Sequence, residues 1–253
     1  MANQFFWYDV MTTDTDAAAG FYRDVVGWAT QDAGQVNQDY TLFTIGGVAV
    51  AGLMPIPEII KDHAQPCWRG YVAVDDVAQA VKAIEEAGGT IHRPPQNAAG
   101  VICFAVVADP QGAVFLVAKS LSPQSQPELA LGTPGTIGWR ELYAREWKSA
   151  FGFYERVFGW TKADSFDMGP MGTYQLFAAG GAPVGGMMTK PEVVPVPNWG
   201  YYINVEAIDA ALERVKAGGG SILIGQREVP GGQWIVQCLD PQGGYFALVA
   251  FKR

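Results

Sequence analysis

Two carboxylates occupy equivalent places in an internal repeat and are the residues best suited to chemistry. Asp9 follows Trp7 by two residues in one strand-like segment, and Glu141 follows Trp139 in another. The differences 139 − 7 and 141 − 9 both equal 132. Period-two alternation places each carboxylate on the same strand face as its tryptophan. A carboxylate buried in a sheet costs on the order of several kcal/mol unless it is paired or hydrogen-bonded.

Two interpretations of these carboxylates stay open. In the structural one, backbone groups or an arginine satisfy each carboxylate; Arg69 is the natural partner of Asp9. In the functional one, a carboxylate meets a polar group of a small ligand, or acts as a general base after burial raises its pKa. The second half has Arg140 beside Glu141 but Gly200 at the place of Arg69, so we expect Glu141 to face more open space.

The repeat extends well beyond these residues. The segment 7–28 holds Phe-Tyr, four residues, then Gly-Trp, and the segment 139–160 repeats this order at the same offset. The sequence Asp-Pro-Gln-Gly occurs at 109–112 and again at 240–243. Matched landmarks at a nearly constant offset indicate duplication of a whole unit.

Each half predicts strand, helix and further strands, twice over. In the first half, a strand precedes the helix cap Asp14 and the helix stop Gly27, strands follow within 40–54, and a second strand and helix span 68–87. Two strands flank the turn 109–112. The fold class is therefore α+β, with four βαβββ modules. We predict a first domain over 1–121, a Ser-, Pro- and Gln-containing linker over 122–134, and a second domain over 135–253.

Composition narrows the possible functions. The net charge is −8 and the pI about 4.7, which argues against nucleic acid as a partner. No apolar run approaches the roughly 20 residues that span a membrane, and the start of the chain lacks the pattern of a secretion signal. The three cysteines show no metal or redox spacing. We expect a cytoplasmic protein, either a monomer or a homodimer.

Histidines and aromatic residues supply the other candidates. His92 lies in a predicted strand, and His63 lies in a proline-rich loop; neither recurs in the second half. Tryptophans begin the first strand of every module, and Tyr71 recurs as Tyr202, with Asn204 nearby. Such aromatic residues serve either as ordinary core packing or as the wall of a pocket for a flat apolar ligand.

These motifs together resemble the vicinal oxygen chelate superfamily, which includes glyoxalase I, bleomycin-resistance proteins and extradiol dioxygenases. The chain looks most similar to the tandem two-domain bacterial type. The resemblance implies two half-open β-sheet cups. It also implies metal ligands at positions that carry over to Trp7, Arg69, Leu116, Trp139, Gly200 and Ala247. None of these offers the imidazole, carboxylate or thiolate donors that divalent metals need.

The resemblance and the residues lead to three function hypotheses. The first is a metal-independent glyoxalase/bleomycin-resistance-like protein that binds a small molecule, of which an aromatic compound is one type. No cofactor is predicted, and a divalent metal stays open as the alternative. The second is an enzyme, a lyase, isomerase or dioxygenase-type oxidoreductase that uses a cup carboxylate or an unrecognised metal site. The third is an interaction module. The candidate ligand-binding residues are Trp7, Asp9, Arg69, Tyr71, His92, Trp139, Glu141, Tyr202 and Asn204.

Overall fold

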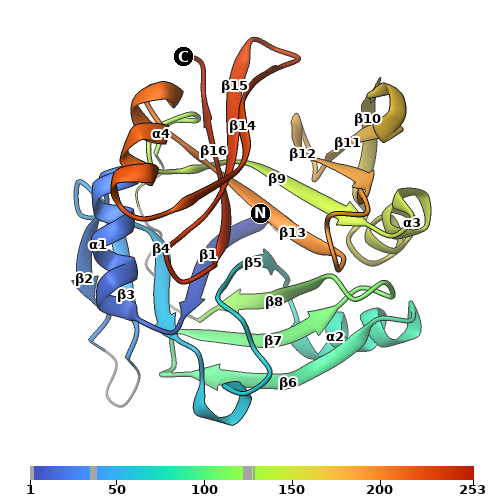
Figure 1. The fold of residues 1–253 in the computed structure, drawn as a ribbon. Helices are drawn as coiled ribbons and strands as arrows, with labels where there is room; N and C mark the ends of the chain where they lie inside the picture. The colour runs from blue at the N-terminus through green and yellow to red at the C-terminus, as the bar shows by residue number, and fades with distance from the viewer. Residues whose placement is uncertain (1–2, 35–38, 122–126, 128) are drawn as a thin grey trace. The chain divides into compact units, whose positions relative to one another are not determined.

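The predicted α+β class and its four modules are confirmed. The structure is a computed structural model, which describes residues 3–34, 39–121, 127 and 129–253. Within this part it contains four α-helices and sixteen strands (Figure 1). The first half comprises β1 (Phe5–Thr12), α1 (Thr15–Val26), β2 (Ala29–Asp32), β3 (Thr41–Ile45), β4 (Val48–Pro55), β5 (Cys67–Ala73), α2 (Val77–Glu86), β6 (Thr90–Ala98), β7 (Ile102–Ala108) and β8 (Val114–Ser120).

The second half repeats this order. It comprises β9 (Ile137–Ala144), α3 (Trp147–Phe158), β10 (Thr161–Asp167), β11 (Thr173–Ala178), β12 (Pro183–Thr189), β13 (Asn198–Asn204), α4 (Ile208–Ala217), β14 (Ser221–Val229), β15 (Gln233–Leu239) and β16 (Tyr245–Ala250). Two short 3₁₀ helices, Glu58–Ile60 and Gly169–Met171, lie in the connections. The first of them lies between β4 and β5, in the proline-rich segment with His63 that the sequence predicts as a loop. Residues 122–126 and 128 of the predicted linker lie outside the described residues.

Every module has the same strand order. Its first strand pairs in parallel with its fourth, as β1 does with β4 and β9 with β12. The third strand is antiparallel to the fourth, and the second to the third. The modules that begin with β5 and β13 follow the same rule. The described strands do not close the sheet into a barrel.

Local capping signals define the helices. Asp14 accepts a hydrogen bond from the Ala17 amide at 2.9 Å, and Gly27 ends α1 with φ 89°, as the sequence predicts. Asp76 caps α2 in the same way. The α4 helix differs, because its N-cap is Ala207, which offers no side-chain hydrogen bond.

Two compact units make up the chain, and each combines modules from both halves. Unit 1 comprises Met1–Trp7, Arg69–Ser125 and Trp139–Gly200, and unit 2 comprises Tyr8–Trp68, Gln126–Gly138 and Tyr201–Arg253. In unit 1, the helices α2 and α3 contact each other; in unit 2, α1 and α4 do so. The domain limits 1–121 and 135–253 describe the repeat along the sequence and stay a prediction.

A buried hydrogen-bond chain lies in the core of each unit. In unit 2, the Trp68 indole donates to the Tyr22 hydroxyl at 2.8 Å, and that hydroxyl lies 2.9 Å from Asp240 Oδ2. In unit 1, Trp199 donates to Tyr154 at 3.0 Å, and the Tyr154 hydroxyl lies 3.2 Å from Asp109 Oδ2. The repeated Phe-Tyr and Asp-Pro-Gln-Gly motifs therefore meet across the two halves of the sequence. Trp68 and Trp199 are core residues.

Candidate functional site

The two repeated carboxylates are buried, each opposite a glycine. Asp9 has no exposed surface, and its register partner on β4 is Gly52. Glu141 is 5% exposed, and its partner on β12 is Gly186. Paired residues on neighbouring strands point to the same side of a sheet, so each glycine leaves space beside its carboxylate.

A tyrosine ring fills the space over each glycine. In unit 2, a Cβ added to Gly52 would run into the ring and hydroxyl of Tyr40. In unit 1, a Cβ on Gly186 would run into the ring and hydroxyl of Tyr174. Carboxylate, glycine and tyrosine thus recur as a set in both halves.

In unit 1, this set forms a hydrogen-bond chain that begins at a candidate residue. The Trp139 indole donates to the Tyr174 hydroxyl, with 2.9 Å between Nε1 and Oη. The Tyr174 hydroxyl in turn donates to the carboxylate of Glu141. Two predicted ligand-binding residues, Trp139 and Glu141, are therefore joined through a third that the sequence interpretation did not include.

The electrostatics keep Tyr174 protonated. Burial in the sheet raises the pKa of Tyr174 well above its ordinary value near 10, and the negative charge of Glu141 raises it further. The hydrogen bond from Trp139 opposes this shift but does not cancel it. Near neutral pH, Tyr174 is a hydrogen-bond donor to Glu141.

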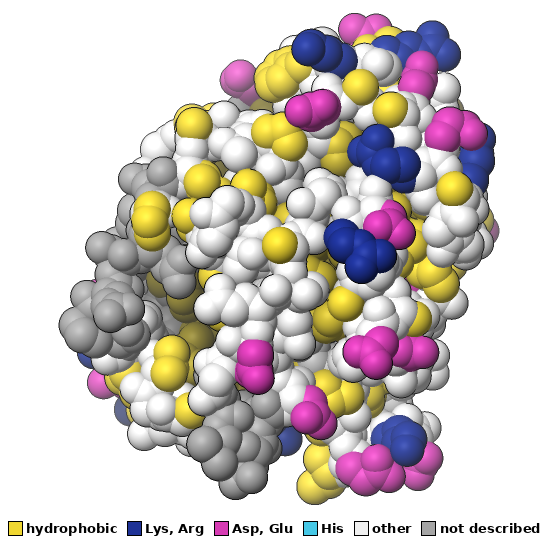
Figure 2. Space-filling view, turned by 90° about the vertical axis from the view of Figure 1, so that its left-hand side faces the viewer, with side chains coloured by type: hydrophobic (Ala, Val, Ile, Leu, Met, Phe, Trp, Pro, Cys, Tyr) yellow, Lys and Arg dark blue, Asp and Glu magenta, His cyan; other side chains and the backbone are white. Residues whose placement is uncertain are grey.

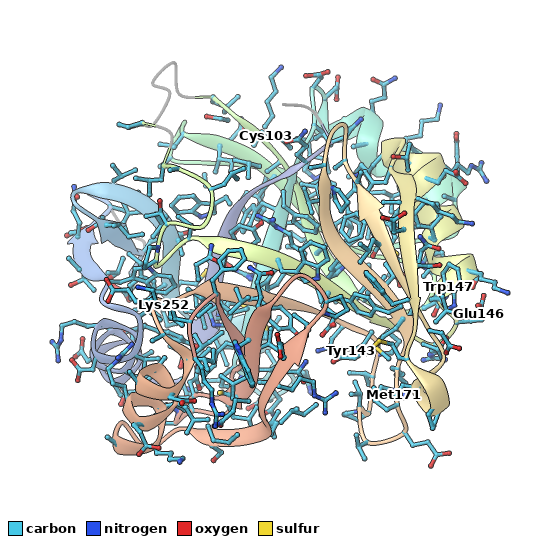
Figure 3. The ribbon with its side chains drawn as sticks, turned by 90° about the horizontal axis from the view of Figure 1, so that it is seen from above. Cys103, Tyr143, Glu146, Trp147, Met171 and Lys252 are labelled. Carbon is cyan, nitrogen blue, oxygen red and sulfur yellow. The ribbon has the colours of Figure 1, made fainter. Side chains whose placement is uncertain are left out.

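Apolar and aromatic side chains extend the same face of this sheet. Tyr174 is paired with Met188 on one side and Phe166 on the other, and Met188 is paired with Tyr143. Tyr143 and Met188 are buried, while Phe166 and Tyr174 are partly exposed. Figure 3 shows Tyr143 further inside the molecule than Glu146 and Trp147, which lie at its edge. We call Trp139, Glu141, Tyr143, Phe166, Tyr174 and Met188 the unit 1 face.

The opposite face of these strands holds the neighbouring arginine. Arg140 directly precedes Glu141 in β9, so the two side chains point to opposite faces of the sheet. The Arg140 guanidinium donates to the Val184 carbonyl at 3.4 Å. In the unit 1 sheet the carboxylate therefore lies among aromatic residues and apart from this cation.

Tyr71 and Tyr202 lie in contrasting surroundings. In unit 1, Tyr71, Leu116 and Ala118 form a buried cluster against which Trp7 packs. In unit 2, Tyr202 is paired with Ala247, and Gln237 Nε2 donates to its hydroxyl at 2.6 Å. Tyr202 therefore has a smaller strand neighbour than Tyr71 does, Ala247 in place of Leu116, and Gln237 as a polar partner.

The remaining candidates are placed as follows. Asn204 donates to Thr136 Oγ1 at 2.9 Å and packs against Gly138, which gives it a structural role in holding the start of β9. His92 is exposed on β6. Arg69 is partly buried on β5 of unit 1, whereas Asp9 belongs to unit 2, and their pairing stays a prediction.

Tyr40 and Tyr174 were missed, although a signal for them exists in the sequence. The differences 174 − 40, 186 − 52 and 180 − 46 all equal 134. The difference 180 − 46 joins the Gly-Gly turns at 46–47 and 180–181, which lie between the third and fourth strands of their modules. A search for tyrosines and glycines that recur at this offset would have found both sets.

The carried-over metal positions do not fit a metal ion. Trp7 and Leu116 belong to one apolar cluster, Ala247 is buried between Tyr202 and Gln237, and a guanidinium such as that of Arg69 has no lone pair to donate. Among the described residues, no three His, Cys, Asp or Glu side chains form a group that could hold a metal.

Surface charge and helix length bear on other partners. On the face that Figure 2 shows, Lys and Arg side chains lie among Asp and Glu side chains. In the described part of the chain, no helix combines the length and apolar character that crossing a bilayer requires. The cytoplasmic location stays a prediction.

Comparison with known families agrees with this architecture. Residues 6–118 match the family described as a glyoxalase-like domain, and residues 136–248 match the Glyoxalase/Bleomycin resistance protein/Dioxygenase superfamily. The chain belongs to this superfamily, with two such domains in tandem. The resemblance inferred from the sequence motifs is confirmed.

Relatives along the whole length carry two kinds of name. The protein named "Putative glyoxylase CFP32" from Mycobacterium tuberculosis is 31% identical over 249 residues, which cover 96% of this chain and 93% of the relative. The "Anthracycline biosynthesis protein DnrV" from Streptomyces peucetius is 30% identical over 260 residues, which cover 98% of this chain and 93% of the relative.

Solved structures share the fold at low identity. The Mn(II)-bound glyoxalase from Novosphingobium aromaticivorans has a TM-score of 0.68 at 18% identity, covering 100% of this chain and 83% of that one. The 2,3-dioxygenase LapB from Pseudomonas sp. KL28 has a TM-score of 0.65 at 14% identity, covering 99% and 93%.

Proposed function

We propose that this protein binds a small aromatic molecule without the help of a metal ion. The observation that carries the proposal is the replacement of the superfamily's metal ligands by residues without suitable donors. Trp7 and Leu116 lie in an apolar cluster, and the buried carboxylate Glu141 is hydrogen-bonded by Tyr174. A metal site needs several convergent O, N or S donors, and the carried-over positions do not supply them.

The chemistry of the unit 1 face supports an aromatic ligand. Ligand sites are mostly apolar, with a small number of polar groups that fix orientation. Trp139, Tyr143 and Phe166 supply flat surfaces, and Glu141 and Tyr174 supply polarity. The anthracycline name of one relative agrees with this class of ligand, because anthracyclines contain a flat aromatic ring system.

Binding after metal removal tests the proposal. The purified chain, treated with EDTA and dialysed, is titrated with flat aromatic probes while tryptophan fluorescence is followed. We expect saturable binding of at least one probe, with a dissociation constant that Zn²⁺, Mn²⁺ or Fe²⁺ changes by no more than about twofold. Binding that is lost with EDTA and restored by one of these ions would contradict the proposal.

An enzymatic role is the second candidate, and the burial of Glu141 favours it. A buried carboxylate can act as a general base toward a bound substrate. On a substrate identified from the probes, Glu141→Gln and Asp9→Asn should then reduce turnover by a factor of about 100 or more. Full turnover in both variants would remove the acid/base role.

A further inference from the structure

The strands of one module differ from the others in their charge. In the module that begins with β5, the strands carry Arg69, Arg93 and Lys119 and neither Asp nor Glu, a net charge of +3. The strands of the first, third and fourth modules have net charges of −2, −1 and 0, from Asp9 and Asp32, then Arg140, Glu141, Lys162, Asp164 and Asp167, then Arg227 and Glu228. In a chain of net charge −8, the β5–β8 sheet is therefore the part best suited to a negatively charged partner.

One face of this sheet places a cation and an aromatic ring in a single row. Arg93 on β6 is paired with Val106 on β7. Val106 is paired with Leu116 on β8, and Leu116 with Tyr71 on β5. Paired residues on neighbouring strands point to the same side of a sheet. We define the β5–β8 face as these four residues together with the next pair along, Gln96 and Phe104.

The apolar part of this face is open to solvent. Tyr71 and Leu116 are buried and form its floor. Phe104 and Val106 pack against the floor but keep part of their surface exposed. Val114 alternates with Leu116 along β8, so it lies on the same side, and it is 40% exposed. Exposed apolar side chains that adjoin one another are typical of a binding surface, and this one is accessible to a small molecule.

Arg93 gives the face its positive charge. Its side chain is partly buried on β6, and the ion pairs among the described residues do not include it. A guanidinium presents a planar fork of donors that matches the two oxygens of a carboxylate. An anion that approached Arg93 would meet no carboxylate on β5, β6, β7 or β8 to repel it.

We infer that the β5–β8 face binds a flat aromatic carboxylate, with its ring against Phe104, Val106 and Leu116 and its carboxylate hydrogen-bonded by Arg93. The inference rests on the proposed function, since it names the class of aromatic molecule, and it adds a face distinct from the unit 1 face. Neighbouring strands lie about 4.8 Å apart. A ring over Val106 is therefore one strand away from Arg93, a distance that an arginine side chain spans.

A matched pair of probes tests the inference on the full chain. 2-Naphthoate carries a carboxylate, and 2-naphthamide has the same ring system and nearly the same shape without the charge. Isothermal titration calorimetry near neutral pH measures the dissociation constant of each probe. We expect 2-naphthoate to bind the native protein at least about tenfold more tightly, the factor typical of a hydrogen bond between charged groups.

Two substitutions separate the charge from the ring contact. Arg93→Met removes the cation and keeps a long unbranched side chain, so the preference for 2-naphthoate should fall to about threefold or less. Phe104→Leu removes ring contact alone, so it should weaken both probes by a similar factor, about threefold or more, and leave the preference unchanged. Arg156→Met is the matched control, because Arg156 is an exposed arginine on α3 of the same unit; its preference should equal that of the native protein. Thermal unfolding and circular dichroism establish that each variant is folded.

The outcomes separate the inference from the proposed function. Equal binding of the two probes to the native protein, a preference that survives Arg93→Met, or unchanged affinities in Phe104→Leu would overturn the inference while leaving aromatic binding in place. A preference that Arg156→Met also removes would overturn it as well, since the effect would then come from the charge of the chain in general. Binding of neither probe would count against the inference and, together with a failure of all other aromatic probes, against the proposed function.

Discussion

Gly186 is the residue that lets the Tyr174 ring lie beside Glu141. A Cβ at this position would meet the Tyr174 ring, and crowding of this kind costs about 1–3 kcal/mol. Gly186→Ala should therefore lower the free energy of unfolding by about this amount and displace Tyr174. Urea unfolding measures the change.

Gly152 provides the matched control within the same unit. It lies in the middle of α3, and a Cβ there would meet nothing within 4 Å. Gly152→Ala should raise the unfolding free energy by about 0.5–1 kcal/mol, because alanine loses less entropy in a helix. Equal effects of the two substitutions would show that Tyr174 does not lie against Gly186 in solution.

Asp109 should make stability depend on pH in the opposite direction to an ordinary paired carboxylate. Burial raises the pKa of Asp109 above its ordinary value of 3.8, although hydrogen bonds from Ala113, Gln111 and Tyr154 oppose this. The folded protein binds the Asp109 proton more tightly than the unfolded chain does. Protonation of Asp109 therefore stabilises the fold below pH 3.8, and this stabilisation is lost as pH rises through the higher pKa of the folded state. Asp109→Asn should remove this dependence.

The comparison requires melting temperatures of the native protein, Asp109→Asn and Glu146→Gln at several pH values from 3 to 7. The melting temperature of Asp109→Asn should rise relative to that of the native protein as pH increases. The melting temperature of Glu146→Gln should fall relative to that of the native protein over the same range, because hydrogen bonds from the Lys148 and Ser149 amides lower the pKa of Glu146 below 4.5. Parallel curves for the native protein and Asp109→Asn would contradict the assignment.

At the scale of elements, α4 lacks a cap that its counterparts have. Ala207 has φ −147° and ψ 134°, close to the values at the caps Asp14 and Asp76, but provides no acceptor. Ala207→Asp should therefore stabilise the protein by about 0.5–2 kcal/mol, measured by urea unfolding. Asp14→Ala is the reverse control and should destabilise α1 by a similar amount. A loss of stability in Ala207→Asp would show that the two cap sites are not equivalent.

The elements also show what the sequence could predict. Alternation and capping residues located the first strand and the ends of α1, because these signals are local. The four residues of β2 are all exposed, so this strand shows no alternation of buried and exposed side chains. The contact between Tyr22 and Asp240 spans 218 residues, and the placement of Tyr174 over Gly186 depends on the register between β11 and β12. Partners of this kind follow from tertiary pairing, which local patterns do not encode.

At the scale of the whole molecule, duplication supplied two copies of one scaffold that have since diverged. Each copy keeps a set of carboxylate, glycine and tyrosine. The set is Asp9, Gly52 and Tyr40 in the first half, and Glu141, Gly186 and Tyr174 in the second. Leu116 is replaced by the smaller Ala247, and the equivalent of Val106 is the polar Gln237. Equivalent positions in the two copies therefore differ in side-chain size and polarity.

The most direct test of metal-independent binding is the metal content of the purified native protein, measured by elemental analysis together with its melting temperature in added Zn²⁺, Ni²⁺, Mn²⁺ and Fe²⁺. Metal-independent binding predicts far less than one ion per chain and an unchanged melting temperature. One ion per chain or per domain, with a rise of several degrees that follows ion concentration as linkage requires, would contradict it.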